Sequence, residues 1–230
     1  MTLKQGHALT STLTSWPKTP KYPFLTLLIS GGHTLLLLAT SSQSFQIIAT
    51  TRDESIGRTF DKVSKLLGLK WTSLGPGDAL EQFCAEPQVD HPSIPPFPRP
   101  LLGQLAYSFS AFHSHVTNFM NEHGGHENVD VLTRRALARA FQSAAVGHLE
   151  EKLILGLDLC KKKGIYIQDI VVSGGVASNQ FLRDRYANST CNFLCICSCL
   201  ETCRLRTCLL EYDKDTHYEL SFPPPHLCTG

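Results

Sequence analysis

The chain has 230 residues, of which 42% are hydrophobic and 18% charged, so it can bury a core and is not a disordered polymer. Lys and Arg number 21 against 20 for Asp and Glu. The formal charge of +1 excludes a strongly basic nucleic-acid binder, although not one with a local basic patch. The longest aliphatic run, residues 35–39, is far shorter than the roughly 20 residues of a membrane helix, so no membrane partner is expected.

The nine cysteines do not form a recognisable disulfide or metal pattern. Six of them fall between Cys191 and Cys208, and their spacing differs from the two separated pairs of a structural zinc site. The N-terminus resembles neither a secretory signal nor a transit peptide, so we expect a reducing, intracellular setting.

The first part of the chain predicts three short buried strands. Apolar runs at residues 24–29, 34–40 and 45–51 are broken by Gly and Ser, which is typical of strands joined by tight turns. A helix is expected over residues 59–67, and a second short helix after Gly77. Residues 87–100 contain six prolines and predict a loop.

The second part predicts a long helix, a strand and another helix, which is the order of an α/β protein. The long helix covers residues 132–159, the strand 165–172 and the last helix 177–185. We expect three arginines to form a solvated face of the long helix: Arg134, Arg135 and Arg139.

A repeated turn links the two parts. Ser30-Gly31-Gly32 and Ser173-Gly174-Gly175 each follow a buried strand. Glycine lets backbone amides converge on a phosphate or carboxylate, so the pair predicts two related halves that present amides to one ligand.

Two polar residues near these turns each have a functional and a structural interpretation. Asn179 could contact a ribose or a base, or it could cap the following helix. Asp61 could accept hydrogen bonds from ribose hydroxyls, or it could form a solvated pair with Lys62. Spacing alone does not choose between them.

Six motifs, in this order, resemble the tRNA N6-adenosine threonylcarbamoyltransferase family, formerly called the glycoprotease or O-sialoglycoprotein endopeptidase family. They are FLTLLISGGHT (24–34), ESIGRTFDKVSKLLGL (54–69), YSFS (107–110), AFQSA (140–144), IVVSGGVASN (170–179) and FPPPHLCT (222–229). The loop WTSLGPG (71–77) looks most like the mitochondrial branch in fungi.

The resemblance implies an α/β, actin-like or Hsp70-like ATPase fold with two lobes around a nucleotide-like ligand. The activity that it implies is transfer of the threonylcarbamoyl group from threonylcarbamoyl-adenylate to N6 of the adenosine 3′ of the anticodon, in tRNAs that read codons beginning with A. Threonylcarbamoyl-adenylate, tRNA and a second copy of the chain are the expected partners. The branch implies a mitochondrial location; otherwise a cytoplasmic one is expected.

Matched motif by motif, the resemblance assigns nine residues to the acyl-adenylate. They are Leu28, Ile29, Ser30, Gly31, Gly32, Asp61, Gly77, Glu81 and Asn179. Gly75 replaces Gly77 if the loop is aligned differently. The resemblance leaves the catalytic residues unknown.

The family's metal site is only partly present. The family holds one divalent ion, Fe or Zn, with a His-x-x-x-His motif and an Asp. His7 matches the second histidine, whereas the first falls on Leu3 and the Asp on Gly230. We therefore expect at most weak metal binding.

The resemblance also divides the chain. Residues 1–100 are expected to be the remnant of an incomplete first lobe, and residues 101–185 with 218–230 the second lobe. Residues 186–217 contain the cysteine cluster and no family residue, and a translated intron or a gene truncated at both ends would explain them. Two alternatives stay open: an inactive family member that serves only as an interaction module, and a phosphotransferase of the same fold.

Overall fold

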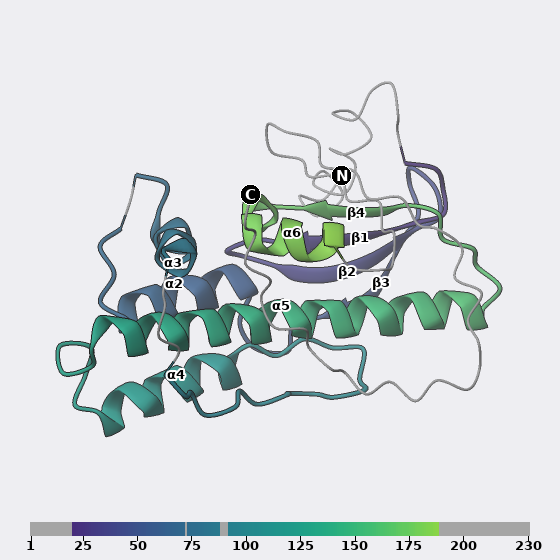
Figure 1. Cartoon of the computed structure of the whole chain (residues 1–230). Coiled ribbons are helices and arrows are strands. Elements are labelled where there is room, and N and C mark those ends of the chain that lie inside the picture. The colour runs from purple at the N-terminus through teal and green to yellow at the C-terminus, as the bar shows by residue number, and fades with distance from the viewer. Residues whose placement is uncertain (1–19, 72, 88–91, 189–230) are drawn as a thin grey trace.

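A four-stranded mixed sheet forms one layer of the fold, as the computed structural model in Figure 1 shows. The structure describes residues 20–71, 73–87 and 92–188. The strands are β1 (Phe24–Ile29), β2 (Thr34–Ala39), β3 (Phe45–Thr50) and β4 (Ile170–Ser173), in the order β3-β2-β1-β4. The first three strands are antiparallel neighbours, and β4 pairs with β1 in parallel.

Helices cover one face and one end of this sheet. They are α2 (Ile56–Leu66), α3 (Pro76–Ala85), α4 (Ser110–Glu122), α5 (Val131–Lys162), the 3-10 helix η1 (Gly175–Ser178) and α6 (Gln180–Asn188). Helix α5 runs along the sheet, with α2 and α3 near one end of it and α4 on the side away from the sheet (Figure 1). None of the helices in the described part of the chain is long and apolar enough to span a bilayer.

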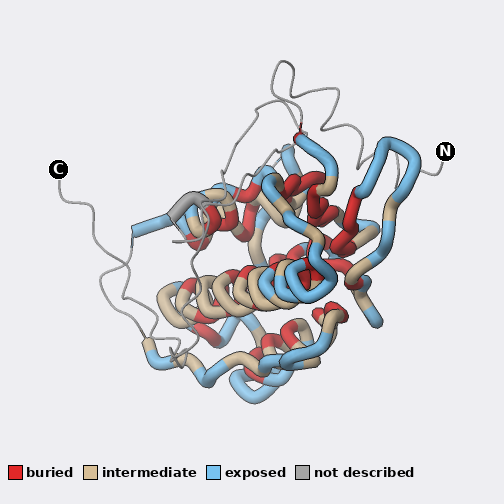
Figure 2. Tube along the Cα trace, turned by 90° about the vertical axis from the view of Figure 1, so that its right-hand side faces the viewer, coloured by how far each residue is buried: buried red, intermediate tan, exposed pale blue. Residues whose placement is uncertain are grey.

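The main core lies between the sheet and the helices, where Figure 2 shows the buried segments. It is built from alternate residues of β1 and β2, such as Leu27 and Leu36, together with Phe60 of α2 and Phe141 of α5. A Cβ added to Gly156 would lie 2.5 Å from Leu36 Cδ2, so α5 crosses the sheet closely at this glycine.

Most predicted elements are confirmed, with shifted ends. The α/β class, the first three strands and the long helix are present, and residues 87 and 92–100 of the Pro-rich segment contain no helix or strand. The predicted strand over residues 165–172 is reduced to β4, and the last helix is divided into η1 and α6 at Asn179. Helix α4 was not predicted, because six polar residues in its first nine obscure the apolar stripe.

The two Ser-Gly-Gly turns do not come from separate lobes, and that expectation is wrong. Leu28 of β1 lies opposite Ser173 of β4 in the parallel register, so both turns follow neighbouring strands of one sheet. Residues from both expected lobes therefore share one sheet and one core. Residues 186–188 of the expected insertion at 186–217 end α6, with Tyr186 in the main core, and the rest of the insertion and the segment 218–230 lie outside the described residues.

Asp53 joins the loop after β3 to the start of α4. Its carboxylate accepts hydrogen bonds from the hydroxyls of Ser108 and Ser110 at 2.6 and 2.5 Å, and from the Phe109 amide at 2.9 Å. Burial by itself would raise the pKa of Asp53, but these bonds and one from the Glu54 amide outweigh it and lower the pKa to about 2.

Gly174→Ala should strongly destabilise the fold. Gly174 has φ 107°, and an added Cβ would overlap the Ile29 carbonyl oxygen. We expect a loss of about 3 kcal/mol or more in the free energy of unfolding, measured with urea. Gly175→Ala is the matched control, because a Cβ there would meet no heavy atom within 4 Å. Equal losses in the two variants would contradict this account.

Asp53→Asn should flatten the acid limb of the stability curve. The folded pKa of Asp53 is about 2, below its ordinary value of 3.8, so its contribution is complete above pH 4 and is lost as the pH falls towards 2. Thermal melts between pH 7 and 2 should show a smaller drop in Tm for Asp53→Asn than for the unmodified chain. Asp158→Asn, which alters an exposed acid on α5, should keep the original drop.

Candidate functional site

The turn between β1 and β2 is the first part of the site. The Ser30 hydroxyl accepts hydrogen bonds from the Gly32 and His33 amides at 3.3 and 3.0 Å, which fixes the turn. A Cβ added to Gly31 or Gly32 would meet no heavy atom within 4 Å, so the space above both glycines is open. The side chains of Leu28 and Ile29 are buried, and only their backbone can face a ligand.

The turn after β4 lies beside the first one. Gly174 is so close to the Ile29 carbonyl that no other residue fits there. The next residue, Gly175, is exposed, and the space above it is open. The two turns therefore form one surface of exposed glycine backbone at the carboxyl ends of two parallel strands.

Helix α2 brings Asp61 to this surface. A Cβ added to Gly57 would lie 2.7 Å from the Gly31 amide nitrogen, and the Ser55 hydroxyl donates to the Gly31 carbonyl at 2.6 Å. Asp61 is one helical turn beyond Gly57, on the same face of α2. Its side chain is exposed, but partial burial raises the pKa of the carboxyl.

Helix α3 adds Gly77 and Glu81. A Cβ added to Gly77 would lie 3.9 Å from Asp61 Oδ1, so the two residues are neighbours. Glu81 is one turn further along α3, and its Oε1 accepts a hydrogen bond from the Gln180 amide, at the start of α6, at 2.6 Å. Burial raises the pKa of Glu81, and the charge of Asp78 adds to this, while the Gln180 amide opposes it.

Asn179 connects Glu81 to the core. Its Oδ1 accepts hydrogen bonds from the Leu182 amide at 3.0 Å and from Gln142 Nε2 at 3.4 Å. It also bonds Glu81 through its side chain. The capping interpretation of Asn179 is therefore confirmed, and the same side chain holds Glu81 in place.

These contacts form a closed series, that is, a ring of elements around the two turns in which each element contacts the next. From the first turn the series passes to α2 at Gly57 and Asp61, to α3 at Gly77 and Glu81, and to the start of α6. It returns through η1, because the Ala177 amide donates to the Gly174 carbonyl at 2.9 Å. The N-termini of α2, α3 and α6 all lie in this series, and helix N-termini favour an anion such as a phosphate.

Three arginines of α5 hold the far ends of α2 and α3. Arg134 donates to the Leu67 carbonyl at 2.8 Å, and Arg139 donates to the Cys84 carbonyl at 2.8 Å. Arg135 donates to the Phe83 carbonyl at 3.1 Å. The expectation of a solvated arginine face is wrong, since these guanidinium groups bind the C-terminal carbonyls of the helices that carry Asp61 and Glu81.

Sequence reasoning missed the residues that position the site. Ser55, Gly57 and Gln142 lie within or beside recognised motifs but received no role. The helix N-cap preference for Ser was the available signal for Ser55. Gln142 offered none, because a buried amide bonded to Asn179 depends on how α5 packs against η1.

The described residues do not form a metal site. No three His, Cys, Asp or Glu side chains in the described ranges lie close enough together to hold an ion. His7, Leu3 and Gly230, at the three positions of the family's ligands, lie outside those ranges. The divalent ion therefore stays a prediction, and the chemistry proposed below has no step that depends on it.

Comparison with known proteins gives one consistent family. A family model described as tRNA N6-adenosine threonylcarbamoyltransferase matches residues 4–229. A relative of that name from Methylobacillus flagellatus is 33% identical over 183 residues, which cover 79% of this chain and 50% of the relative. A mitochondrial relative from Schizosaccharomyces pombe is 31% identical over 235 residues, covering 98% of this chain and 50% of its own length.

The chain spans about half the length of the curated relatives that it matches. A solved structure, the activator of a 2-hydroxyisocaproyl-CoA dehydratase from Clostridium difficile, aligns with a TM-score of 0.45 and 13% identity over 84% of this chain and 59% of that one. The α/β assignment rests on the sheet and helices themselves, and the family assignment rests on the sequence match. The chain belongs to the tRNA N6-adenosine threonylcarbamoyltransferase family.

Proposed function

We propose that this chain supplies the adenylate site for threonylcarbamoyl transfer to tRNA. The donor is threonylcarbamoyl-adenylate, and the acceptor is N6 of the adenosine 3′ of the anticodon in tRNAs that read codons beginning with A. The observation that carries the proposal is the closed series of contacts. Residues from four separate segments of the chain, namely the Ser30 turn, Asp61, Glu81 and Asn179, become neighbours around open glycine backbone.

The proposed acyl transfer asks little covalent chemistry of the protein. An exocyclic amine is a poor nucleophile, but a carbamoyl-phosphate anhydride is a strong electrophile with AMP as its leaving group. N6 attacks the carbamoyl carbon, the bond from that carbon to the phosphate oxygen breaks to release AMP, and the proton lost by N6 passes to solvent water. The protein then has mainly to position the reactants and stabilise oxygen charge.

Each part of the site has a proposed role in holding the adenylate. The glycine backbone of the two turns and the nearby helix N-termini would face the phosphate. Asp61, whose carboxylate is exposed and has no hydrogen bond among the described residues, would accept hydrogen bonds from the ribose hydroxyls. Glu81 and Asn179 are tied to the start of α6 and would form a rigid wall of the site.

A mitochondrial location and a homodimer are part of this proposal. The mitochondrial relative from Schizosaccharomyces pombe aligns over nearly the whole chain, which supports the first. The homodimer rests on the family resemblance alone. Membership of this family favours neither the phosphotransferase nor the interaction-module alternative.

Asp61→Ala should weaken adenylate binding without a matching loss of stability. The carboxylate supports no described hydrogen bond, so its removal should change Tm by less than about 2 °C. Loss of charge-assisted bonds to two ribose hydroxyls should raise the Kd for a non-hydrolysable threonylcarbamoyl-adenylate analogue on the order of tenfold, measured by calorimetry. Asp158→Asn is the control for a change of surface charge. An Asp61→Ala variant that binds the analogue as well as the unmodified chain would refute the ribose contact.

The purified chain should bind threonylcarbamoyl-adenylate and transfer its acyl group to unmodified tRNA. Mass spectrometry of the digested tRNA would detect the modified nucleoside, with and without added Fe²⁺ or Zn²⁺. Asp61→Ala should lower the yield at limiting adenylate. Binding without transfer under any metal condition would support the inactive alternative, and absence of adenylate binding would overturn the proposed function.

A further inference from the structure

A second feature lies at the end of the sheet opposite the glycine turns. An open hollow of about 560 Å³ is formed there by the start of β1, the end of β2 and the loop between α5 and β4. Its lining includes Lys21, Tyr22, Thr40, Tyr166 and Gln168. In Figure 1 this is the end where α5 finishes and the chain turns back into β4. Nothing in the adenylate site uses these residues.

Two exposed aromatic rings flank the hollow. Tyr22 is 38% exposed and Tyr166 is 56% exposed. The Tyr22 ring packs with its centroid 5.0 Å from that of Phe24, which fixes one of the two rings on the sheet. Exposed rings of this kind are platforms on which unpaired bases stack, with little dependence on sequence.

The same end of the molecule is basic. Lys162 is the last residue of α5 and Lys163 is its C-cap, and both are exposed. Lys21, which comes shortly before β1, is exposed as well. The nearby acid Asp169 accepts a hydrogen bond from the Lys21 backbone amide at 2.7 Å. The adjacent β2–β3 turn, residues 41–44, consists only of Ser and Gln and adds no negative charge. We call the surface of Lys21, Lys162, Lys163, Tyr22 and Tyr166 the basic end.

Helix C-termini attract lysines without any ligand, because cations offset the negative end of the helix dipole. That effect accounts for Lys162 and Lys163. It does not account for Lys21, which comes from a segment about 140 residues earlier in the chain, or for two exposed tyrosines around a hollow. Lysines beside exposed aromatic rings are instead the combination that binds single-stranded nucleic acid.

We propose that the basic end binds the RNA substrate, with the lysines on its phosphates and the tyrosines against an unpaired base. The inference rests on the proposed function, since it identifies a surface for the RNA whose adenosine reaches the glycine turns. Strand β1, from Phe24 to Ile29, joins the two sites and has a length of about 20 Å. One folded RNA can therefore contact both ends of the strand.

The test compares two double charge reversals in the full chain. The first carries Lys162→Glu and Lys163→Glu, and the control carries Lys65→Glu and Lys70→Glu, at exposed lysines away from the hollow. Binding of an unmodified tRNA anticodon stem-loop is followed by fluorescence anisotropy at several salt concentrations. The first variant should bind on the order of tenfold more weakly, and its slope of log K against log salt should be smaller by about two.

A third variant, Tyr166→Ala, tests stacking. It should weaken RNA binding about fivefold with an unchanged salt slope, because a ring releases no counterions. The proposal would be overturned by equal losses in both double variants, or by an unmodified chain that binds no RNA. It would also be overturned if the Lys162→Glu, Lys163→Glu variant lost binding only to a poly-glutamate peptide and still bound RNA normally. All three variants should bind the adenylate analogue normally. If RNA binding depends on the basic end but the chain binds no adenylate, the proposed function is refuted, while the proposal that the basic end binds RNA still holds.

Discussion

The site depends on backbone-to-backbone contacts that only glycine permits. Gly174 lies against the Ile29 carbonyl, and Gly57 lies against the Gly31 amide, so β4 and α2 both approach the end of β1 without an intervening side chain. A methyl group at Gly174 would push the second turn away from β1, and one at Gly57 would push α2 away from the first turn. The short distances between the residues around the turns therefore follow from the absence of two Cβ atoms.

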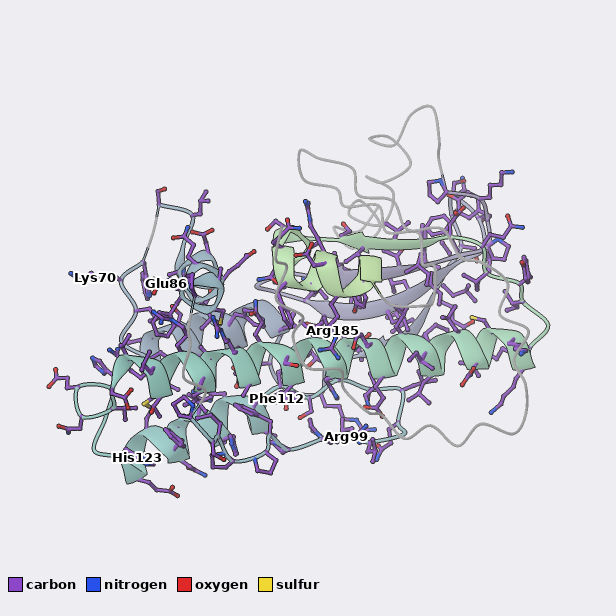
Figure 3. All side chains as sticks on the ribbon, viewed as in Figure 1. Lys70, Glu86, Arg99, Phe112, His123 and Arg185 are labelled. Carbon is purple, nitrogen blue, oxygen red and sulfur yellow. The ribbon has the colours of Figure 1, made fainter. Side chains whose placement is uncertain are left out.

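A second constraint is that helix ends are completed by side chains from other elements. Asp53 binds the first amides of α4, Glu81 binds the first amide of α6, and arginines of α5 bind the last carbonyls of α2 and α3. Helix α3 has only ten residues, follows Gly75 without a side-chain cap, and buries only Ala79, Leu80 and Cys84. Its place therefore depends on Arg135 and Arg139 at one end and on the bond from Glu81 to α6 at the other. Figure 3 shows Arg185 beside α5, where it reaches Glu150 at 2.8 Å and ties α6 to the same long helix.

The sequence allowed the elements to be predicted better than their partners. Apolar residues at helical spacing predict α5, and short apolar runs ending in Gly predict β1 and β4, because these signals are local. The placement of the two turns in separate lobes was wrong, since strand pairing between residues 28 and 173 leaves no local signal. The same holds for the hydrogen bond between Glu81 and Gln180, which are 99 residues apart. The arginines of α5 looked solvated for the same reason, because their acceptors are carbonyls, which every residue has.

The position of the site residues within the fold explains why the family motifs are short and scattered. Two of the motifs contain a glycine that must be small, Gly57 or Gly174, a few positions before a polar residue, Asp61 or Asn179. The small residue sets the distance between two elements, and the polar residue one turn or a few positions later then reaches the shared surface. A site assembled from five elements in this way cannot be recognised from any one motif. It is recognised only when the parallel pairing of β1 with β4 brings the motifs together.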